Sequence, residues 1–234
     1  MPISRTAIPL LGLAALALAT IPAHAQLTSY ATRADFNAAF SGLPVETFEA
    51  ANVGPGTITG IPSPLDNTTS NTVFTTGSIQ DGLRIADTGA DSGDSKALAV
   101  TGAGATTYAS KAVYDNFYSD GLTLTFYNNG GVQAVGLDLI SYVTAATQTV
   151  PDYRGATVLG LYPPTVSAKG TFFGVSSGGA PITSLSIAGD DSHTRGVDNI
   201  AFGGAAPEPA TWLPFAFTGL AAATLILKAK RRNA

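Results

Sequence analysis

The clearest pattern in the chain is an alternation of apolar and polar residues with a period of two. In residues 122–127 (LTLTFY), the leucines and the phenylalanine would share one face, and residues 135–139 show the same alternation. Residues 128–131 (NNGG) lie between these runs, and Asn and Gly tolerate the positive φ of tight turns. The two runs are therefore predicted to pair as a hairpin.

Further segments with strand character are separated by Gly, Pro, Asn and Asp. They are residues 43–48, 82–86, 97–101, 111–114, 156–161, 171–176, 182–187 and 197–202. Short strands at this spacing predict an all-β fold, an antiparallel β-sandwich. Residues 51–71 are rich in Pro, Gly, Thr and Asn and are predicted to form a long surface loop.

One short segment near the start of this body has helical rather than strand periodicity. Thr32 and Asp35 have the spacing of a capping box, and Phe36 and Phe40 lie four residues apart on one helix face. Residues 33–40 are therefore predicted to form the one short N-terminal helix of the body.

The N-terminus has the three parts of a secretory signal peptide. Arg5 supplies a positive charge, residues 8–21 are apolar, and Ala23 and Ala25 form the small-x-small cleavage pattern. Cleavage after Ala25 is predicted, which makes residues 1–25 a signal helix that is removed. The alternative is an uncleaved membrane anchor.

The C-terminus combines a helix breaker, an apolar run and a basic end. Pro207-Glu208-Pro209 is followed by the uncharged residues 210–227, long enough for a transmembrane helix. An indole favours the outer boundary of a bilayer, and cations stay on its cytoplasmic side. The residues that would flank the anchor in this way are Trp212, Lys228, Lys230, Arg231 and Arg232.

This ending, with APEPATW, the apolar run and KAKRR, resembles the PEP-CTERM sorting signal of bacterial surface proteins. The resemblance implies transient processing by a membrane-embedded exosortase near Pro207-Glu208-Pro209. It also implies an inner-membrane intermediate of a Gram-negative bacterium, then delivery to the cell surface or extracellular matrix. An ordinary stop-transfer helix is the alternative. The predicted organisation is a signal peptide (1–25), an extracellular domain (26–205) and a sorting segment (206–234: motif 207–209, helix 210–227, basic tail 228–234).

Composition narrows the classes of function open to the body. The 234 residues include no Cys, which excludes disulfides, thiol nucleophiles and thiolate metal sites. Residues 26–206 hold 15 Asp and Glu against seven Lys and Arg, a net charge of −8. Nucleic acid is not expected as a partner, because its phosphates require a basic face.

The body resembles the β-sandwich domains of PEP-CTERM proteins, which are jelly-roll-like and similar to carbohydrate-binding modules. The matching stretches are ETFE, QAVGLDL, FFGVSS, ITSLSI and VDNIAFG. The resemblance implies a structural Ca²⁺ held by Glu49 and Asp198, the one cofactor expected. By alternation Asp198 would face the core with Ile200 and Phe202, where a carboxylate needs a partner. The alternative is that Asp198 caps a turn through backbone N–H groups.

The aromatic residues could form a platform for sugar rings, although tyrosine is also common in ordinary strands. The set comprises Tyr108, Tyr114, Phe117, Tyr118, Tyr127, Tyr142, Tyr153 and Tyr162. His193 is the one histidine after the signal peptide and no catalytic constellation is evident, so the body is not expected to be an enzyme.

The predicted function is that of a non-enzymatic exported protein that binds or organises extracellular polysaccharide. The alternative is a secreted glycan hydrolase that uses carboxylates, with Glu46 acting together with Glu49 or Asp138. Asp138 lies opposite the apolar face of its strand and is expected to face solvent.

Overall fold

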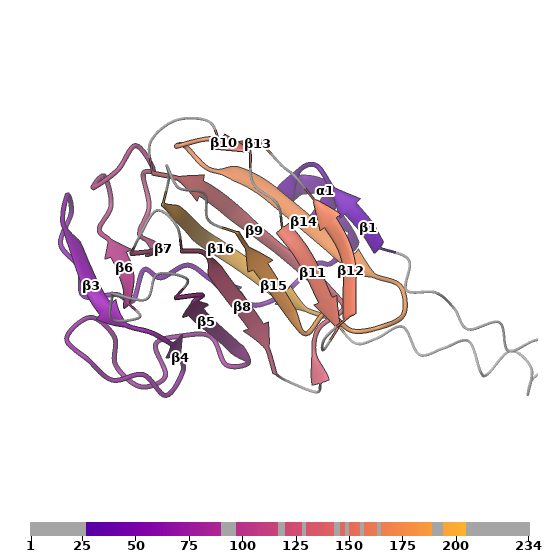
Figure 1. Ribbon diagram of the computed structural model, residues 1–234, viewed down its shortest axis with the longest axis horizontal. Helices are drawn as coiled ribbons and strands as arrows, with labels where there is room; N and C mark the ends of the chain where they lie inside the picture. Colours follow the sequence, from indigo (N-terminus) through magenta and orange to yellow (C-terminus); the bar gives the residue numbers. More distant parts are fainter. Residues whose placement is uncertain are drawn as a thin grey trace, which may run out of the picture.

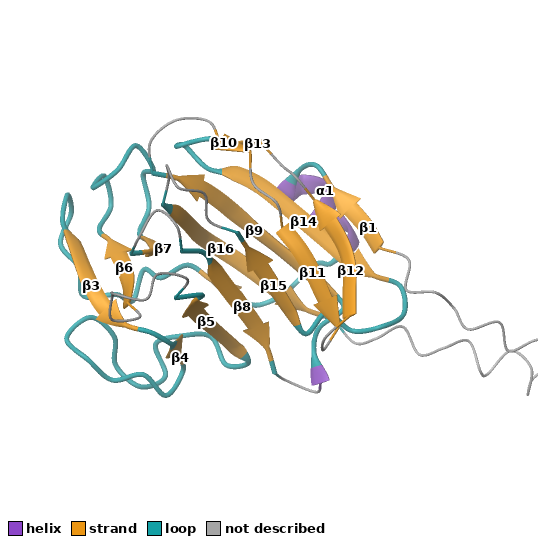
Figure 2. Ribbon diagram, viewed as in Figure 1, coloured by secondary structure: helices purple, strands orange, loops and turns teal. Residues whose placement is uncertain are grey.

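The computed structural model is a sandwich of two antiparallel sheets with one short helix at its edge (Figures 1 and 2), as predicted. It describes residues 27–89, 97–116, 120–127, 130–142, 146–147, 150–154, 157–162, 165–188 and 194–204. The predicted signal helix and the whole sorting segment lie outside these residues. Within the described residues, no helix has the length and apolarity needed to cross a bilayer.

The larger sheet is built around strand β16 (Arg195–Gly203), the last strand of the described chain. One edge of β16 pairs with β9 (Ala134–Ser141), and the other pairs first with β7 (Ala112–Asp115) and then with β2 (Val45–Glu46). Beyond β9 lie β14 (Thr171–Ser177) and β1 (Leu27–Tyr30), and beyond β7 lie β6 (Ala97–Thr101) and β3 (Ile58–Pro62).

The smaller sheet covers one face of the larger sheet. Its order is β12 (Thr157–Tyr162), β11 (Val150–Arg154), β15 (Ser184–Ile187), β8 (Leu122–Phe126), β5 (Leu83–Asp87) and β4 (Leu65–Asp66). A separate two-stranded ribbon consists of β10 (Ala146–Thr147) and β13 (Thr165–Val166).

The core lies between the two sheets and is formed by alternate residues of their strands. Leu122, Leu124 and Phe126 face inward from β8, as the alternation predicted, and all are buried. Their partners across the interior include Phe202 of β16, whose ring centroid is 5.4 Å from that of Phe126. Because the body buries one contiguous apolar cluster, it folds without disulfides.

The predicted hairpin between residues 122–127 and 135–139 is wrong. β8 pairs with β5 and β15 in the smaller sheet, whereas β9 pairs with β14 and β16 in the larger sheet. The chain crosses between the sheets near Val132, which forms a bridge with Ile182. Two amphipathic strands can bury their apolar faces side by side or face to face, and alternation alone does not distinguish the two arrangements.

The predicted helix is confirmed as α1 (Arg33–Ala39), and Thr32 caps it by accepting a hydrogen bond from the Asp35 amide at 3.1 Å. Phe36 from this helix is fully buried against the outer face of the larger sheet. It fits there because Gly136 has no side chain: a Cβ at that position would lie 2.8 Å from the Phe36 ring.

The predicted surface loop over residues 51–71 is wrong in part. This segment contributes the edge strands β3 and β4, and both Ile61 and Leu65 are buried in the core. The prolines beside them are compatible with strands at a sheet edge, where one side of the backbone needs no ladder partner.

Candidate functional site

The outer face of the larger sheet, which points away from the core, carries three adjoining features. Helix α1 covers one part of it with Phe36. A polar network lies beside the helix, and a cleft lies beyond the network, over β7, β6 and β3. The positions on this face follow from register: Ala99, Tyr114, Gly196 and Ile140 are successive cross-strand neighbours from β6 to β9.

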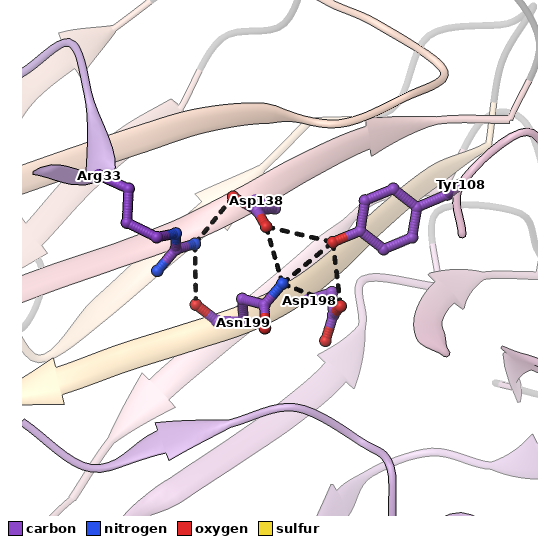
Figure 3. A network of polar contacts seen from close by, with 5 residues as sticks. All are labelled: Arg33, Tyr108, Asp138, Asp198 and Asn199. Atoms are coloured by element: carbon purple, nitrogen blue, oxygen red, sulfur yellow. Dashed lines mark hydrogen bonds and ion pairs between the residues drawn. The ribbon is translucent and has the colours of Figure 1, made fainter. Parts of the chain in front are cut away.

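The polar network joins α1, β9, β16 and the loop between β6 and β7 (Figure 3). Arg33 pairs with Asp138 at 2.8 Å and also donates to the Asn199 carbonyl oxygen at 3.2 Å. The Tyr108 hydroxyl lies 3.1 Å from Asp138 Oδ2 and 3.0 Å from Asp198 Oδ2. The Asn199 amide donates to Asp138 at 2.8 Å and lies 3.2 Å from Asp198. The network therefore fixes the helix to the sheet.

The network has fewer donor hydrogens than it has close contacts between polar atoms. Tyr108 has one hydroxyl hydrogen but faces two carboxylates, so it can donate to only one of them at a time. The pKa of Asp198 is raised to about 7, mainly because burial removes the carboxylate from water. A proton on Asp198, or a cation beside it, would supply the charge that the network lacks.

The expected orientation of Asp198 toward the core, beside Ile200 and Phe202, is wrong. The pairing of β16 with β9 shifts between Asp198 and Ala201, and Asn199 in this bulge has φ 49°. The extra residue reverses the alternation, so Asp198 lies opposite Asp138 on the outer face while Ile200 and Phe202 remain in the core. Asp198 is nevertheless fully buried, because Tyr108 lies over it.

Asp138 is on the face opposite the apolar residues of β9, as predicted, but it does not simply face solvent. Its side chain is 19% exposed and is held by Arg33, Tyr108 and Asn199. The ion pair with Arg33 is thus the second function of α1, in addition to burying Phe36.

Glu49, the other predicted calcium ligand, lies next to the same buried region. The Ser110 hydroxyl donates to Glu49 Oε1 at 2.7 Å, and hydrogen bonding from Ser110 also partly offsets the raised pKa of Asp198. Both carboxylates therefore lie near one hydroxyl. Phe48, directly before Glu49, has φ 54°, a conformation that is costly for a bulky residue and that often marks a functional site.

The fit of this region to a calcium ion rests on one atom above all. Asp198 Oδ1 is buried and accepts no hydrogen bond of normal geometry within the described residues, although the Ser110 hydroxyl, which donates to Glu49, lies close enough to lower the pKa of Asp198. Such an orphaned carboxylate oxygen is a suitable ligand for a hard cation. The Lys111 ammonium, however, donates to the carbonyl oxygens of Glu49 at 2.9 Å and Ala51 at 2.7 Å, so these two oxygens are engaged. Among the described residues, no group of three acidic or histidine side chains is placed to hold a metal.

The cleft on the outer face, which we call the sheet-face cleft, has a volume of about 240 Å³. Tyr142 and Ile58 are its most exposed apolar residues, at 38% and 48% of their surface, and small side chains from β6 form its floor. Its lining residues are Ile58, Ala99, Thr101, Tyr114, Asp115, Asn116, Tyr142 and Thr194. They come from five segments that are far apart in the sequence.

Two tyrosines from the predicted aromatic set meet in this cleft. The rings of Tyr114 and Tyr142 have centroids 6.3 Å apart and are nearly perpendicular, at 87°. Tyr114 lies flat on Gly196, where an added Cβ would be 2.5 Å from its ring, and is only 1% exposed. Tyr142 is therefore the ring of this pair that a ligand can reach, and Tyr114 supports it from below.

Asp115 lies at the end of β7 but its side chain points away from the cleft opening. It pairs in register with Leu98, a core residue, and its Oδ1 accepts a hydrogen bond from the Arg195 amide at 2.8 Å. Asp87 and Asp120, both buried, approach it from the smaller sheet. Burial, reinforced by these two carboxylates, raises the pKa of Asp115 to about 8 despite the opposing charge of Arg195.

The carboxylates named for a hydrolase do not gather in the sheet-face cleft. Glu46 is buried, and its two oxygens accept backbone N–H groups of Phe48 and Gln80, both at 2.7 Å. It borders a separate polar cavity of about 340 Å³ between β2 and residues 77–81. Burial raises the pKa of Glu46, whereas the backbone hydrogen bonds oppose this effect.

Several predicted residues lie apart from the cleft or outside the described residues. Tyr127 is exposed at the end of β8, in the smaller sheet, and Tyr108 belongs to the polar network. The following lie outside the described residues or have side chains that are not described: Ala23, Ala25, Phe117, Tyr118, Tyr153, Tyr162, His193, Pro207, Glu208, Pro209, Trp212, Lys228, Lys230, Arg231 and Arg232.

Comparison with known proteins finds weak structural similarity. No family profile matches the chain, and no curated protein sequence matches it. Among solved structures, the CBM22-1–GH10 modules of Clostridium thermocellum xylanase 10B, complexed with xylohexaose, are similar at 15% identity and a TM-score of 0.35, over 69% of this chain and 28% of that chain.

Two further structures are similar at the same level. TmCBM61 in complex with β-1,4-galactotriose matches at 13% identity and a TM-score of 0.28, over 52% of this chain and 88% of that chain. The K2 cleaved adhesin domain of Lys-gingipain matches at 14% identity and a TM-score of 0.39, over 70% of this chain and 99% of that chain. Similarities this distant carry no argument about function.

The Asp115 cluster predicts that stability decreases as pH rises. The folded chain holds the Asp115 proton up to about pH 8, whereas an unfolded Asp releases it near pH ~3.9, so the unfolded state gains relative stability across this interval. We expect Tm to fall between about pH 5 and pH 9, by about 2–4 °C for each kcal/mol lost. Asp115→Asn, which mimics the protonated form, should flatten this dependence.

The matched control for this measurement is Asp81→Asn, which changes an exposed carboxylate. It should leave the slope of Tm against pH unchanged. A wild-type Tm that rises over this pH range, or an Asp115→Asn slope equal to that of the wild type, would contradict the protonated state of Asp115.

Proposed function

We propose that this chain is a non-enzymatic exported protein whose sandwich binds extracellular polysaccharide in the sheet-face cleft. The observation that carries the proposal is the lining of the cleft, in which the exposed Tyr142 ring and Ile58 lie beside the exposed amide side chain of Asn116. Sugar rings present the same combination of apolar C–H faces and a polar rim. The cleft lies on a rigid sheet, which limits the entropy lost on binding.

In this proposal Tyr142 is the main contact. Its ring stacks on the apolar face of a pyranose, and the perpendicular Tyr114 ring holds it in place. The backbone also supports this position, because the Tyr142 amide donates to the Thr194 carbonyl oxygen at 3.3 Å. The exposed Asn116 amide would then bond to sugar hydroxyl groups.

Replacing Tyr142 tests the proposal. We expect Tyr142→Ala in the full-length chain to weaken binding to a retained polysaccharide by about two- to twelvefold, since aromatic contacts contribute ~0.5–1.5 kcal/mol beyond the area that they bury. Affinity electrophoresis and isothermal titration calorimetry on a polysaccharide panel would measure the change. Tyr127→Ala is the matched control, because Tyr127 is at least as exposed as Tyr142, at 45% against 38%, and lies on the other sheet.

Two results would contradict this reading. Equal losses in the Tyr142→Ala and Tyr127→Ala variants would remove the cleft as the binding site. Hydrolysis of a bound glycan that is lost in Glu46→Gln would favour the alternative of a glycan hydrolase.

The sorting part of the proposal is supported by the two chain ends. Ala23 and Ala25 would direct signal-peptide cleavage, and Pro207-Glu208-Pro209, the apolar run and the basic tail would direct exosortase processing of an inner-membrane intermediate. The product would then reach the cell surface or the extracellular matrix of a Gram-negative bacterium. Mass spectrometry of the protein from its native envelope should find Gln26 as the first residue and a C-terminus near Pro207. An intact Ala234 would disprove the processing step.

We further propose that Glu49 and Asp198 hold a structural Ca²⁺. The ion would use Asp198 Oδ1 and the Glu49 carboxylate and would neutralise the buried negative charge of the network. Millimolar Ca²⁺ should then raise Tm in the wild type, since saturation to about 100 times Kd adds ~2.7 kcal/mol. The shift should disappear in Asp198→Asn and persist in Asp35→Asn, a change at an exposed carboxylate. A wild-type Tm that does not respond to Ca²⁺ would refute the site.

A further inference from the structure

The polar groups around the sheet-face cleft are uncharged at the surface that a ligand would meet. Among its described lining residues, Asn116, Thr101, Thr194 and the two tyrosines are neutral, and Asp115 is the one ionisable acid. Asp115 is 1% exposed and faces the interior, where it accepts the Arg195 amide. Its pKa, raised to about 8 by burial, keeps it mainly protonated at neutral pH. The described lining therefore offers neither a cation nor an exposed anion.

This absence of charge bears on the kind of ligand that can enter. A carboxylate or sulfate placed in the cleft would lose part of its hydration, and no lysine or arginine of the described lining would replace it. The net charge of the body also disfavours charged ligands. Residues 26–206 have a net charge of −8 and repel polyanions at low ionic strength. An uncharged ring incurs neither cost.

The shape of the cleft also limits how many sugar units of a polysaccharide can bind in it. Tyr142 is the one ring of the Tyr114–Tyr142 pair with an accessible surface, and the perpendicular packing of the two prevents both from lying under consecutive sugar units. A volume of about 240 Å³ is below the ~300–1,000 Å³ of typical small-molecule pockets. The contact is thus centred on a single ring rather than on a long platform.

We propose that the sheet-face cleft selects uncharged sugar units, anchors one ring on Tyr142, and rejects uronate and sulfated glycans. This inference rests on the proposed polysaccharide binding and specifies its ligand class. The determinant is the neutral lining, in which Asn116 holds the exposed position nearest the end of β7. A cation at this position would reverse the selection.

The test compares polymers that differ in charge but not in backbone. Polygalacturonate is paired with its fully methyl-esterified form, and carboxymethylcellulose with hydroxyethylcellulose, at low ionic strength with the full-length chain. We expect the wild type to retain at least one neutral polymer at least tenfold more tightly than its charged counterpart. Tyr142→Ala should lose this retention, whereas Tyr127→Ala should keep it.

A substitution at Asn116 provides the converse test. Asn116→Lys should gain affinity for the charged polymers, and the gain should disappear near 1 M salt, where the Debye length is about 3 Å. Asn116→Gln is the control for a longer uncharged side chain and should keep the wild-type preference. Circular dichroism melts would show that each variant is folded, and the wild-type comparison needs no variant.

The outcomes separate this inference from the proposed function. Tyr142-dependent binding in which the charged polymer of either pair is preferred overturns the inference and leaves polysaccharide binding intact. Failure to bind any polymer of a broad panel through Tyr142 overturns both. Tyr142-dependent binding confined to neutral polymers supports both.

Discussion

Strand β16 must match three neighbours at once, and the polar part of the outer face follows from this constraint. β9 runs along one edge, while the other edge pairs with β7 and then with β2. The bulge at Asn199 accommodates the change of neighbour and turns Asp198 to the outer face. Without the bulge the carboxylate would enter the apolar interior, where an unpaired charge is strongly destabilising.

Glycines on the outer face determine what can cover it. Phe36 of α1 requires the missing side chain of Gly136, and Tyr114 requires that of Gly196. Each ring lies close to the backbone at its glycine and covers only the part of the outer face around it. The helix begins at the polar network, of which its first residue Arg33 is a member, and the cleft opens beyond Tyr114. The same sheet thus supports a structural cover and an accessible binding surface side by side.

Buried acids connect stability with the proposed function. Asp115 and Asp198 both have raised pKa values because burial removes them from water, yet they lie in different surroundings. Asp198 has an orphaned oxygen next to the Glu49 region, which suits a cation. Asp115 lies inside the sandwich, where burial and two neighbouring carboxylates favour a retained proton despite the opposing effect of Arg195, and this leaves the nearby cleft uncharged.

Local patterns in the sequence determined the element types. Alternation over residues 122–126 placed the buried side chains of β8 correctly, and the Thr32 cap marked the start of α1, because both depend on neighbours only a few residues away. The resemblance to the sandwich domains of PEP-CTERM proteins also predicts Glu49 and Asp198 as ligands of a structural Ca²⁺. The partner of each strand is not determined locally, which is why alternation predicts a hairpin of β8 and β9 that the structure lacks, and composition predicts a loop where the edge strands β3 and β4 lie.

Only the tertiary structure decided the cleft and the orientation of Asp198. Tyr142 was one of eight aromatic candidates, and its meeting with Tyr114 depends on the register of β7, β16 and β9. Ile58 and Asn116 were not predicted at all, since an exposed apolar residue or amide has no distinctive local signal. The single-residue bulge at Asn199 reversed the face of Asp198. The sequence alone thus determined which residues alternate, whereas long-range pairing decided which of them meet, because register is set by contacts between distant strands.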